Sequence, residues 1–318
     1  MKEYRHKSVL LKEVIYFLKV KKNKTYIDCT LGGGGHTKYI LKKKGKVLAF
    51  EVDKDGLEYS KKRLNKYKNN LIIKNKSYIH LEEVVVEYNL KISGVILDLG
   101  LSSYHLDKSN RGFSFKDKGN LDMRFANNKN VLTASDIVLK WPESKLVEIF
   151  REYGEIKKAK SLARGIITAR KNILKQKQKF IKTSVFVKTI LRIFHIKENS
   201  LGRFKTHPAT KVFQALRIAV NNELINLKKV LPQAIKVLEP GGRLIVISFH
   251  SLEDRIVKQY FKKLAIKCIC PPHNPICICN HKPLIKIITK KAIKARNEEI
   301  KENRRSRSAI LRVAEKIK

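Results

Sequence analysis

Short apolar runs alternate with amphipathic segments along the first third of the chain. Strands are expected at 25–30, 46–52, 70–74 and 94–100, where residues 94–100 read Gly-Val-Ile-Leu-Asp-Leu-Gly. Helical spacing of apolar residues predicts helices at 8–20, 36–44, 55–67 and 81–88. The 94–100 strand is apolar along most of its length, as strands of a parallel sheet covered on both faces are. The alternation therefore predicts an α/β fold.

The pattern changes in the middle of the chain. Residues 101–130 are rich in Gly, Ser, Asp and aromatic residues without periodicity, and helices are then expected at 135–139, 144–153, 158–171 and 184–193. The pattern typical of an α/β fold resumes after these helices. One or two helices are expected over 209–238, broken near Pro232, followed by a turn at 239–242 and strands at 243–249 and 308–314. We therefore expect a core of 1–108 and 207–318, interrupted by a helical insert at 109–206.

Four consecutive glycines, beginning at Gly32, connect the first expected strand to the next helix. Only glycine lets a backbone turn so tightly and approach a ligand so closely. His36 follows the glycines, so the run is neither a dinucleotide fingerprint nor a P-loop. A nucleoside cofactor without phosphates, S-adenosylmethionine, fits this turn better than NAD. The alternative is a glycine-rich turn that only joins a strand to a helix.

Acidic residues are expected at the ends of three neighbouring strands. Asp28 ends the first strand, Glu51 and Asp53 close the second, and Asp98 lies at the end of the fourth. Ligands of open α/β sheets bind at the carboxyl ends of the strands, and a partly buried carboxylate is costly unless it is paired. Together these acids could bind the amine, the ribose and the adenine amine of a cationic nucleoside. For any single acid a purely structural role is equally open.

The charge of the chain favours a polyanionic partner. Lysine and arginine number 70 against 28 acidic residues, a net charge of +42, while 43% of the residues are hydrophobic, enough for a sizeable core. Nucleic acid is the first candidate partner and a membrane surface the second. The lysines are spread along the chain, so the composition of an AT-rich genome is a competing explanation.

The remaining composition predicts a cytoplasmic protein. No apolar run reaches the roughly 18 residues of a membrane-spanning helix. Lys12 and Glu13 interrupt the apolar N-terminal run, which argues against a cleavable signal peptide. The cysteines number five, and an odd number argues against a disulfide framework.

A cysteine-rich segment lies near the C-terminus. Residues 268–281 read Cys-Ile-Cys-Pro-Pro-His-Asn-Pro-Ile-Cys-Ile-Cys-Asn-His, a set of residues that could bind zinc. Both cysteine pairs have one residue between them, whereas zinc sites more often have two. Zinc therefore remains the minority interpretation, and no metal ligand is assigned.

Seven segments, in the right order, resemble the RsmH (MraW) family of small-subunit rRNA methyltransferases: 6–14, 26–37, 94–103, 111–124, 207–224, 238–258 and 304–315. The resemblance implies a class I, Rossmann-like methyltransferase core with an inserted all-helical domain for substrate recognition. It further implies S-adenosylmethionine as cofactor and methylation of the exocyclic N4 of a cytidine in the decoding region of 16S (small-subunit) rRNA. The substrate would be an assembled 30S-type particle, with no membrane and no obligate protein partner.

The resemblance also assigns site residues. Its cofactor contacts fall on Gly34, Gly35, His36, Glu51, Tyr78, Asp98 and His105. Glu51 stands where the family usually has Asp, with Asp53 as the competing choice, and His105 stands where Gln is common. Tyr78 lies in a short shifted loop, so its alignment is less direct. A lone histidine is ordinarily a satisfied surface or loop residue, which is the alternative for His36 and His105.

The sequence offers candidates for catalysis and for RNA binding. Asp98 or the serines at 102 and 103 are the candidate acceptors near the target amine, although the chain lacks the Asp/Asn-Pro-Pro-aromatic pattern of many amino-methyltransferases. Phe113 and Phe115 either stack on a flipped base or pin their loop to the core. A further strip of candidate RNA contacts comprises Arg203, Lys205, His207, Lys211 and Arg217, the last of which could instead form a structural pair.

Two other functions share these features. A methyltransferase acting on DNA or protein would have the same glycine turn and acidic strand ends, and the helical insert favours rRNA over both. A non-catalytic RNA-binding assembly factor is the third possibility, and the intact glycine turn and Asp98 speak against it.

Overall fold

The structure, a computed structural model, describes residues 8–102, 110–126, 131–175, 180–271 and 278–318. The chain forms two compact units: a sheet unit of Met1–Gly100 with Leu224–Lys318, and a helical unit of Leu101–Glu223. The helical unit thus extends beyond the expected bounds of 109–206, most of all at its C-terminal end. The reason is helix α10 (Thr210–Asn221), whose Phe213 and Leu216 pack into the core of the helical unit.

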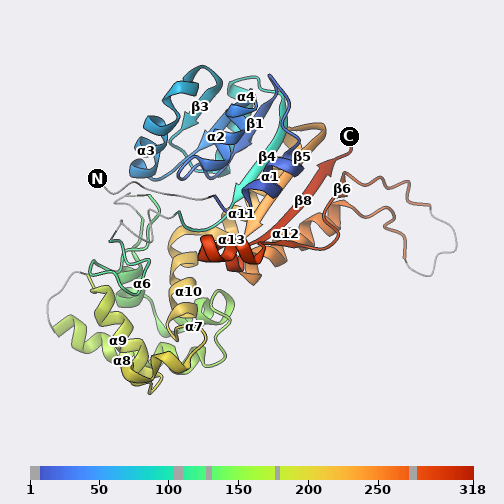
Figure 1. The fold of residues 1–318 in the computed structure, drawn as a ribbon. Coiled ribbons are helices and arrows are strands. Elements are labelled where there is room, and N and C mark those ends of the chain that lie inside the picture. The colour runs from blue at the N-terminus through green and yellow to red at the C-terminus, as the bar shows by residue number, and fades with distance from the viewer. Residues whose placement is uncertain (1–7, 103–109, 127–130, 176–179, 272–277) are drawn as a thin grey trace. The chain divides into compact units, whose positions relative to one another are not determined.

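The sheet unit is built on one sheet, in the order β3-β2-β1-β4-β5-β8-β6, with β7 also pairing with β8 (Figure 1). The strands are β1 (Thr25–Asp28), β2 (Lys46–Phe50), β3 (Leu71–Lys74), β4 (Ile92–Asp98), β5 (Leu238–Ser248), β6 (Ile285–Ile287), β7 (Ile293–Lys294) and β8 (Ile310–Lys316). Strands β1 to β5 are parallel, whereas β8 runs antiparallel to β5. The strand order reverses between β1 and β4, and open α/β sheets bind ligands at such a switch point.

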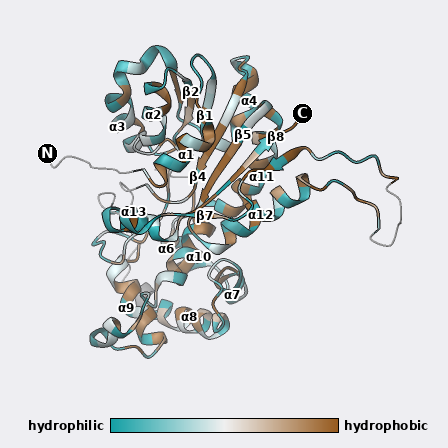
Figure 2. Cartoon of the chain, turned by 45° about the vertical axis from the view of Figure 1, so that its right-hand side comes forward, coloured by the Kyte–Doolittle hydropathy of each residue, from teal (hydrophilic) through white to brown (hydrophobic). Residues whose placement is uncertain are grey.

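Helices cover both faces of this sheet. They are α1 (Leu11–Leu18), α2 (Gly35–Lys42), α3 (Lys54–Leu64), α4 (Leu81–Glu87), α11 (Glu223–Val237) and α12 (Ser251–Leu264). A further short helix of the unit, α13 (Asn297–Glu302), has no buried residue. Successive strand residues alternate between two cores, so Tyr26 packs with residues of α1 and α2, and Ile27 with residues of α4, α11 and α12. The inner strands are correspondingly apolar in Figure 2. Among the described residues, no helix combines the length and the apolar character needed to span a membrane.

The helical unit confirms the expected change of pattern. Its helices are α6 (Ala134–Lys140), α7 (Glu143–Glu152), α8 (Ala159–Lys175), α9 (Thr183–Ile193) and α10 (Thr210–Asn221). The core between them contains Phe150 and Phe186, both fully buried. Thr133 begins α6, because its hydroxyl accepts a hydrogen bond from the Asp136 amide at 3.1 Å and its own amide donates to the Asp136 carboxylate at 2.9 Å.

Two boundaries differ from the sequence prediction. The long helical stretch breaks at Asn222 rather than near Pro232, which lies inside α11; Asn222 has a φ of 51°, a left-handed conformation that asparagine tolerates. Strand β5 begins before the expected turn at 239–242, since Leu238 already pairs with Ile92 on β4 and the register resumes at Arg243. Strands β6 and β7 were not predicted, because runs this short show no alternation.

Candidate functional site

A tight glycine turn connects β1 to α2 at the carboxyl edge of the sheet. Gly34 has a φ of 69°, and a Cβ atom there would lie 2.9 Å from Leu64 Cδ1. A Cβ atom on Gly35 would lie 1.7 Å from Ser8 Oγ. A methyl group at either position would displace a neighbouring side chain, and the left-handed backbone of Gly34 itself favours glycine.

Helix α3 holds the turn from its other side. The Ser60 hydroxyl donates a hydrogen bond to the Gly32 carbonyl, and the Arg63 guanidinium donates to the Gly33 carbonyl. Because these two carbonyls are occupied by α3, the turn keeps a fixed shape. Neither Ser60 nor Arg63 was predicted, since no local pattern indicates that α3 would reach the turn.

Glu51 links the second strand to the glycine turn. One oxygen of its carboxylate accepts a hydrogen bond from the Gly32 amide at 2.7 Å, and the other accepts one from the Asp53 amide at 2.8 Å. Burial raises the pKa of Glu51 to about 7, against the opposing effect of these two amides. A carboxylate has about four acceptor sites, so Glu51 can also accept a hydrogen bond from a ligand.

Asp28 organises the start of the turn. It is 1% exposed. Its carboxylate accepts hydrogen bonds from the Thr37 hydroxyl at 2.6 Å and from the Thr30 amide at 3.1 Å. The Thr30 hydroxyl in turn accepts a hydrogen bond from the Asp98 amide at 2.8 Å. Asp28 therefore fixes the positions of β1 and α2, and a structural role fits this residue better than ligand binding does.

His36 and Asp98 form the centre of the candidate site. The Nε2 atom of His36 lies 3.0 Å from the Val9 carbonyl, which can only accept a hydrogen bond, so this nitrogen carries a proton. The Nδ1 atom faces Asp98 Oδ2 at 3.7 Å. His36 is 4% exposed, so it is a buried residue and not the surface histidine of the alternative interpretation.

Asp98 has both a shifted pKa and an unused acceptor atom. Burial raises its pKa to about 7; His36 opposes the shift, and the charges of Asp28 and Glu253 add to it. Its Oδ1 atom is buried and has no hydrogen-bond partner among the described residues. A buried acceptor without a partner is costly, and at a sheet edge it is a natural point for a ligand to donate a hydrogen bond.

The carboxyl end of β5 adds a second buried pair. Glu253, in the first turn of α12, accepts hydrogen bonds from the amides of Phe249 at 2.8 Å and His250 at 3.3 Å. Its other oxygen lies 3.2 Å from His250 Nε2. Glu253 was not predicted as a site residue, although its charge adds to the raised pKa of Asp98.

The structure brings most of the predicted cofactor residues to one edge of the sheet. Gly34, Gly35 and His36 lie in the turn and the start of α2, Glu51 is bonded to that turn, and Asp98 faces His36. Tyr78 begins a short helical turn after β3 and is partly buried against the sheet core. His105, like Ser103, lies outside the described residues.

The predicted RNA-binding residues of the helical unit divide into two groups. Phe113 is buried and stacks on Phe125 with ring centroids 5.8 Å apart, while Phe115 stacks on His207 at 4.4 Å. Both rings therefore pack within the unit, as the structural alternative proposed. Arg217 pairs with Glu223 at 2.8 Å, and both side chains are largely buried.

The exposed cations of the strip are Arg203, Lys205 and Lys211. Phe204 lies between the first two and is 44% exposed. These side chains remain accessible to a polyanion, unlike Arg217.

The fold and the carboxyl edge of its sheet define the class of protein. It is an open α/β sheet protein that has a candidate ligand site at the switch point of the sheet and carries a helical insert. The chain belongs to the MraW methylase family, whose model matches residues 3–317. It is 43% identical over 317 residues to ribosomal RNA small subunit methyltransferase H of Carboxydothermus hydrogenoformans, covering 99% of each chain. It is 45% identical to the protein of the same name from Halothermothrix orenii, covering 98% of each.

Among solved structures, an rRNA methylase from Streptococcus thermophilus aligns over 98% of both chains, with a TM-score of 0.42 and 11% identity.

Proposed function

We propose that this chain methylates the exocyclic N4 of a cytidine in the decoding region of small-subunit rRNA, with S-adenosylmethionine as the methyl donor. One observation carries the proposal: a linked set of buried and half-buried groups joins the ends of β1, β2 and β4, from Glu51 through the glycine turn to His36 and Asp98. The membership of the family and the names of full-length relatives support rRNA of the small subunit as substrate.

The residues present fit the proposed cofactor. Gly34 and Gly35 let the ligand approach the backbone, and the carboxylate of Glu51 has free lone pairs for ribose hydroxyls. The Oδ1 atom of Asp98 is a buried acceptor with no partner among the described residues. When bound there, S-adenosylmethionine supplies a methyl group on a positively charged sulfur, and a carboxylate lowers the energy of such a cation in a buried site.

The chain's main task is then to align and activate the target amine. The lone pair of a cytosine amine is delocalised into the ring, so the nitrogen is a poor nucleophile. A hydrogen bond from N4–H to the Asp98 carboxylate draws the lone pair back to nitrogen, and the same carboxylate can then accept the proton. With its pKa at about 7, Asp98 is poised to exchange a proton near neutral pH.

The helical unit supports binding of the polyanionic substrate. Its exposed Arg203, Lys205 and Lys211 can contact phosphates, whereas the stacked aromatic pairs stabilise the loop at 111–125. The target base must leave its stack to reach the methyl group, which is easier in an unpaired segment of an assembled 30S-type particle. We place this reaction in the cytoplasm, where such particles are assembled.

A calorimetric titration of the purified chain with S-adenosylmethionine tests the cofactor. We expect saturable binding, weakened about tenfold in Glu51→Gln because the amide nitrogen cannot accept one of the two backbone hydrogen bonds. Absence of binding, even with small ribosomal subunits present, would instead favour the non-catalytic assembly factor. Transfer of labelled methyl to DNA or protein but not to small subunits would favour the other methyltransferase classes.

A further inference from the structure

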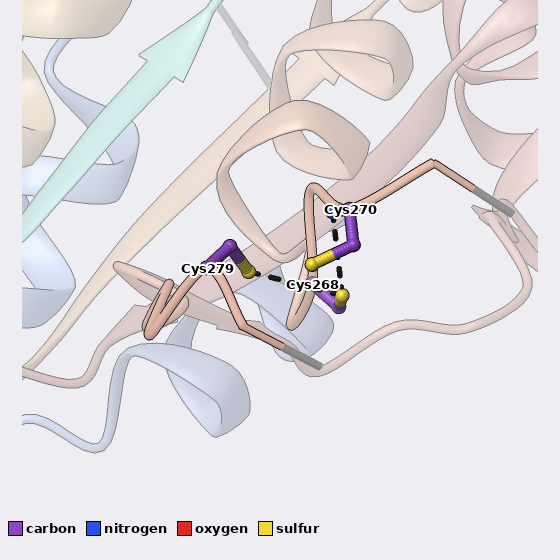
Figure 3. Close-up of side chains that lie close together, drawn as sticks. All are labelled: Cys268, Cys270 and Cys279. Carbon is purple, nitrogen blue, oxygen red and sulfur yellow. Dashed lines mark hydrogen bonds between the residues drawn. The ribbon is translucent and has the colours of Figure 1, made fainter. Parts of the chain in front are cut away.

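Three cysteine sulfurs converge in the long connection between α12 and β6. Cys268 and Cys270 come from its first arm and Cys279 from its second, and the two described arms run side by side (Figure 1). Their sulfur atoms all lie within 4.8 Å of one another. Figure 3 shows the three side chains gathered around a single small space. The remaining cysteine of the segment, Cys277, lies outside the described residues.

The sulfur spacing matches a metal site better than a disulfide. A zinc–sulfur bond of about 2.3 Å in a tetrahedral site places neighbouring sulfurs about 3.8 Å apart. Cys279 Sγ lies 3.8 Å from Cys268 Sγ. A disulfide would require a separation of about 2.05 Å. The separation of these two sulfurs is therefore that of one edge of a tetrahedral metal site.

Backbone amides point at each of the three sulfurs. The Ile269 amide lies 3.4 Å from Cys279 Sγ, the Cys270 amide 3.4 Å from Cys268 Sγ, and the Ile278 amide 3.4 Å from Cys270 Sγ. Backbone amides placed in this way orient the sulfurs and can donate hydrogen bonds to them when a metal is bound. Three thiolates this close repel one another, and a bound cation removes the repulsion.

The described arms of the connection, 265–271 and 278–284, contribute no buried apolar residue to a core. The ends of the arms are tied where the Leu284 amide donates to the Leu264 carbonyl at 2.9 Å. Ile269 and Ile278 are 63% and 75% exposed, so these apolar side chains do not hold the arms together. A metal can supply the missing cross-link between the two arms.

We propose that Cys268, Cys270 and Cys279 bind one Zn²⁺ ion that fixes the two arms of this connection. Three soft thiolates select zinc over magnesium or calcium, which prefer oxygen ligands. The fourth tetrahedral position is left for one further ligand. None of the three cysteines belongs to the sheet-edge site, so the metal's role is structural, and the proposal stands apart from the proposed methyl transfer.

Elemental analysis of the full chain, purified under reducing conditions without chelators, tests the proposal. We expect about one zinc per chain, and near-ultraviolet charge-transfer absorption when Co²⁺ replaces zinc, as thiolate ligation requires. The variant Cys279→Ser should bind zinc about 100-fold more weakly or worse. Cys29→Ala is the matched control, because Cys29 is buried in the sheet core and should leave zinc binding unchanged.

The proposal would be overturned if the wild-type protein contained no zinc after incubation with the metal, or if its Co²⁺ complex showed no thiolate absorption. An unchanged affinity for zinc in Cys279→Ser would also overturn it. A disulfide between Cys268 and Cys279 that persists under reducing conditions would also overturn it. The wild-type measurements are decisive even if a variant fails to fold.

Discussion

The two units of this chain place their polar groups in opposite ways. At the edge of the sheet unit, Asp28 and His36 are 1% and 4% exposed and are bonded to the backbone around them. In the helical unit the aromatic candidates are packed inward, and the cations Arg203 and Lys205 are exposed. The proposed chemistry thus depends on a buried network in which one change has a large effect. Substrate binding is spread over surface charges, each with a small effect.

The sharpest test of the buried network is Asp98→Asn. We expect the rate of methyl transfer to small subunits to fall by about 100-fold or more, because the amide cannot accept the proton. The rate is measured with labelled methyl donor at saturating concentrations. A calorimetric titration of the same variant is the control, and full turnover with normal cofactor binding would remove Asp98 from this role.

A smaller effect is expected at the glycine turn. Gly34→Ala places a methyl group 2.9 Å from Leu64 Cδ1 in a left-handed backbone conformation that costs about 1–2 kcal/mol. We expect the affinity for S-adenosylmethionine to fall about tenfold or more, as measured by calorimetry. Gly202→Ala is the matched control, because a Cβ atom there meets nothing within 4 Å. Equal affinities for the two variants would contradict the assignment of the turn.

The raised pKa of Asp98 predicts a dependence of stability on pH. The folded pKa of about 7 exceeds the ordinary value of 3.8, so the folded protein loses stability as pH rises between these values, and the loss persists above them. Asp98→Asn removes this loss. Its stability relative to wild type should therefore be about 1–3 kcal/mol greater near pH 8 than near pH 5, as measured by urea denaturation. A difference independent of pH would contradict the shifted pKa.

The smallest effect is expected on the exposed strip of the helical unit. Arg203→Ala should weaken binding to small subunits a few-fold without changing stability or cofactor affinity. The salt dependence of binding should fall by the equivalent of about one phosphate contact. Arg217→Ala is the contrasting variant: it breaks the largely buried ion pair with Glu223, and should destabilise the protein by about 3 kcal/mol. If Arg203→Ala destabilised the protein as much as Arg217→Ala, the distinction between an exposed, RNA-binding Arg203 and a buried, structural Arg217 would be wrong.

Much of the sheet unit could be predicted because its signals are local. The apolar strands, the glycine run and the acids at strand ends are contiguous in the sequence, and Asp98 ends β4 as expected. The groups that were missed act over long separations. Ser60 and Arg63 reach back to the glycine turn from α3, and no periodicity indicates such a contact.

The helical unit was harder to predict in its boundaries and in the roles of its side chains. Its helices follow from the spacing of their apolar residues. Helix α10, however, was predicted to belong to the sheet unit, because this spacing shows which face of a helix is apolar and not which hydrophobic core that face joins. Whether Phe115 stacks on a base or on His207 likewise depends on tertiary packing, which the sequence leaves open. The cysteine segment is similar, since only the fold brings Cys279 to Cys268.

The account depends most on the reaction at the sheet edge, and mapping methylated nucleotides in small-subunit rRNA tests it most directly. Cells lacking this gene should have a decoding-region cytidine without its N4 methyl group, and expression of the wild-type chain should restore it. The account would be contradicted if the methylation pattern of the rRNA were the same with and without the gene.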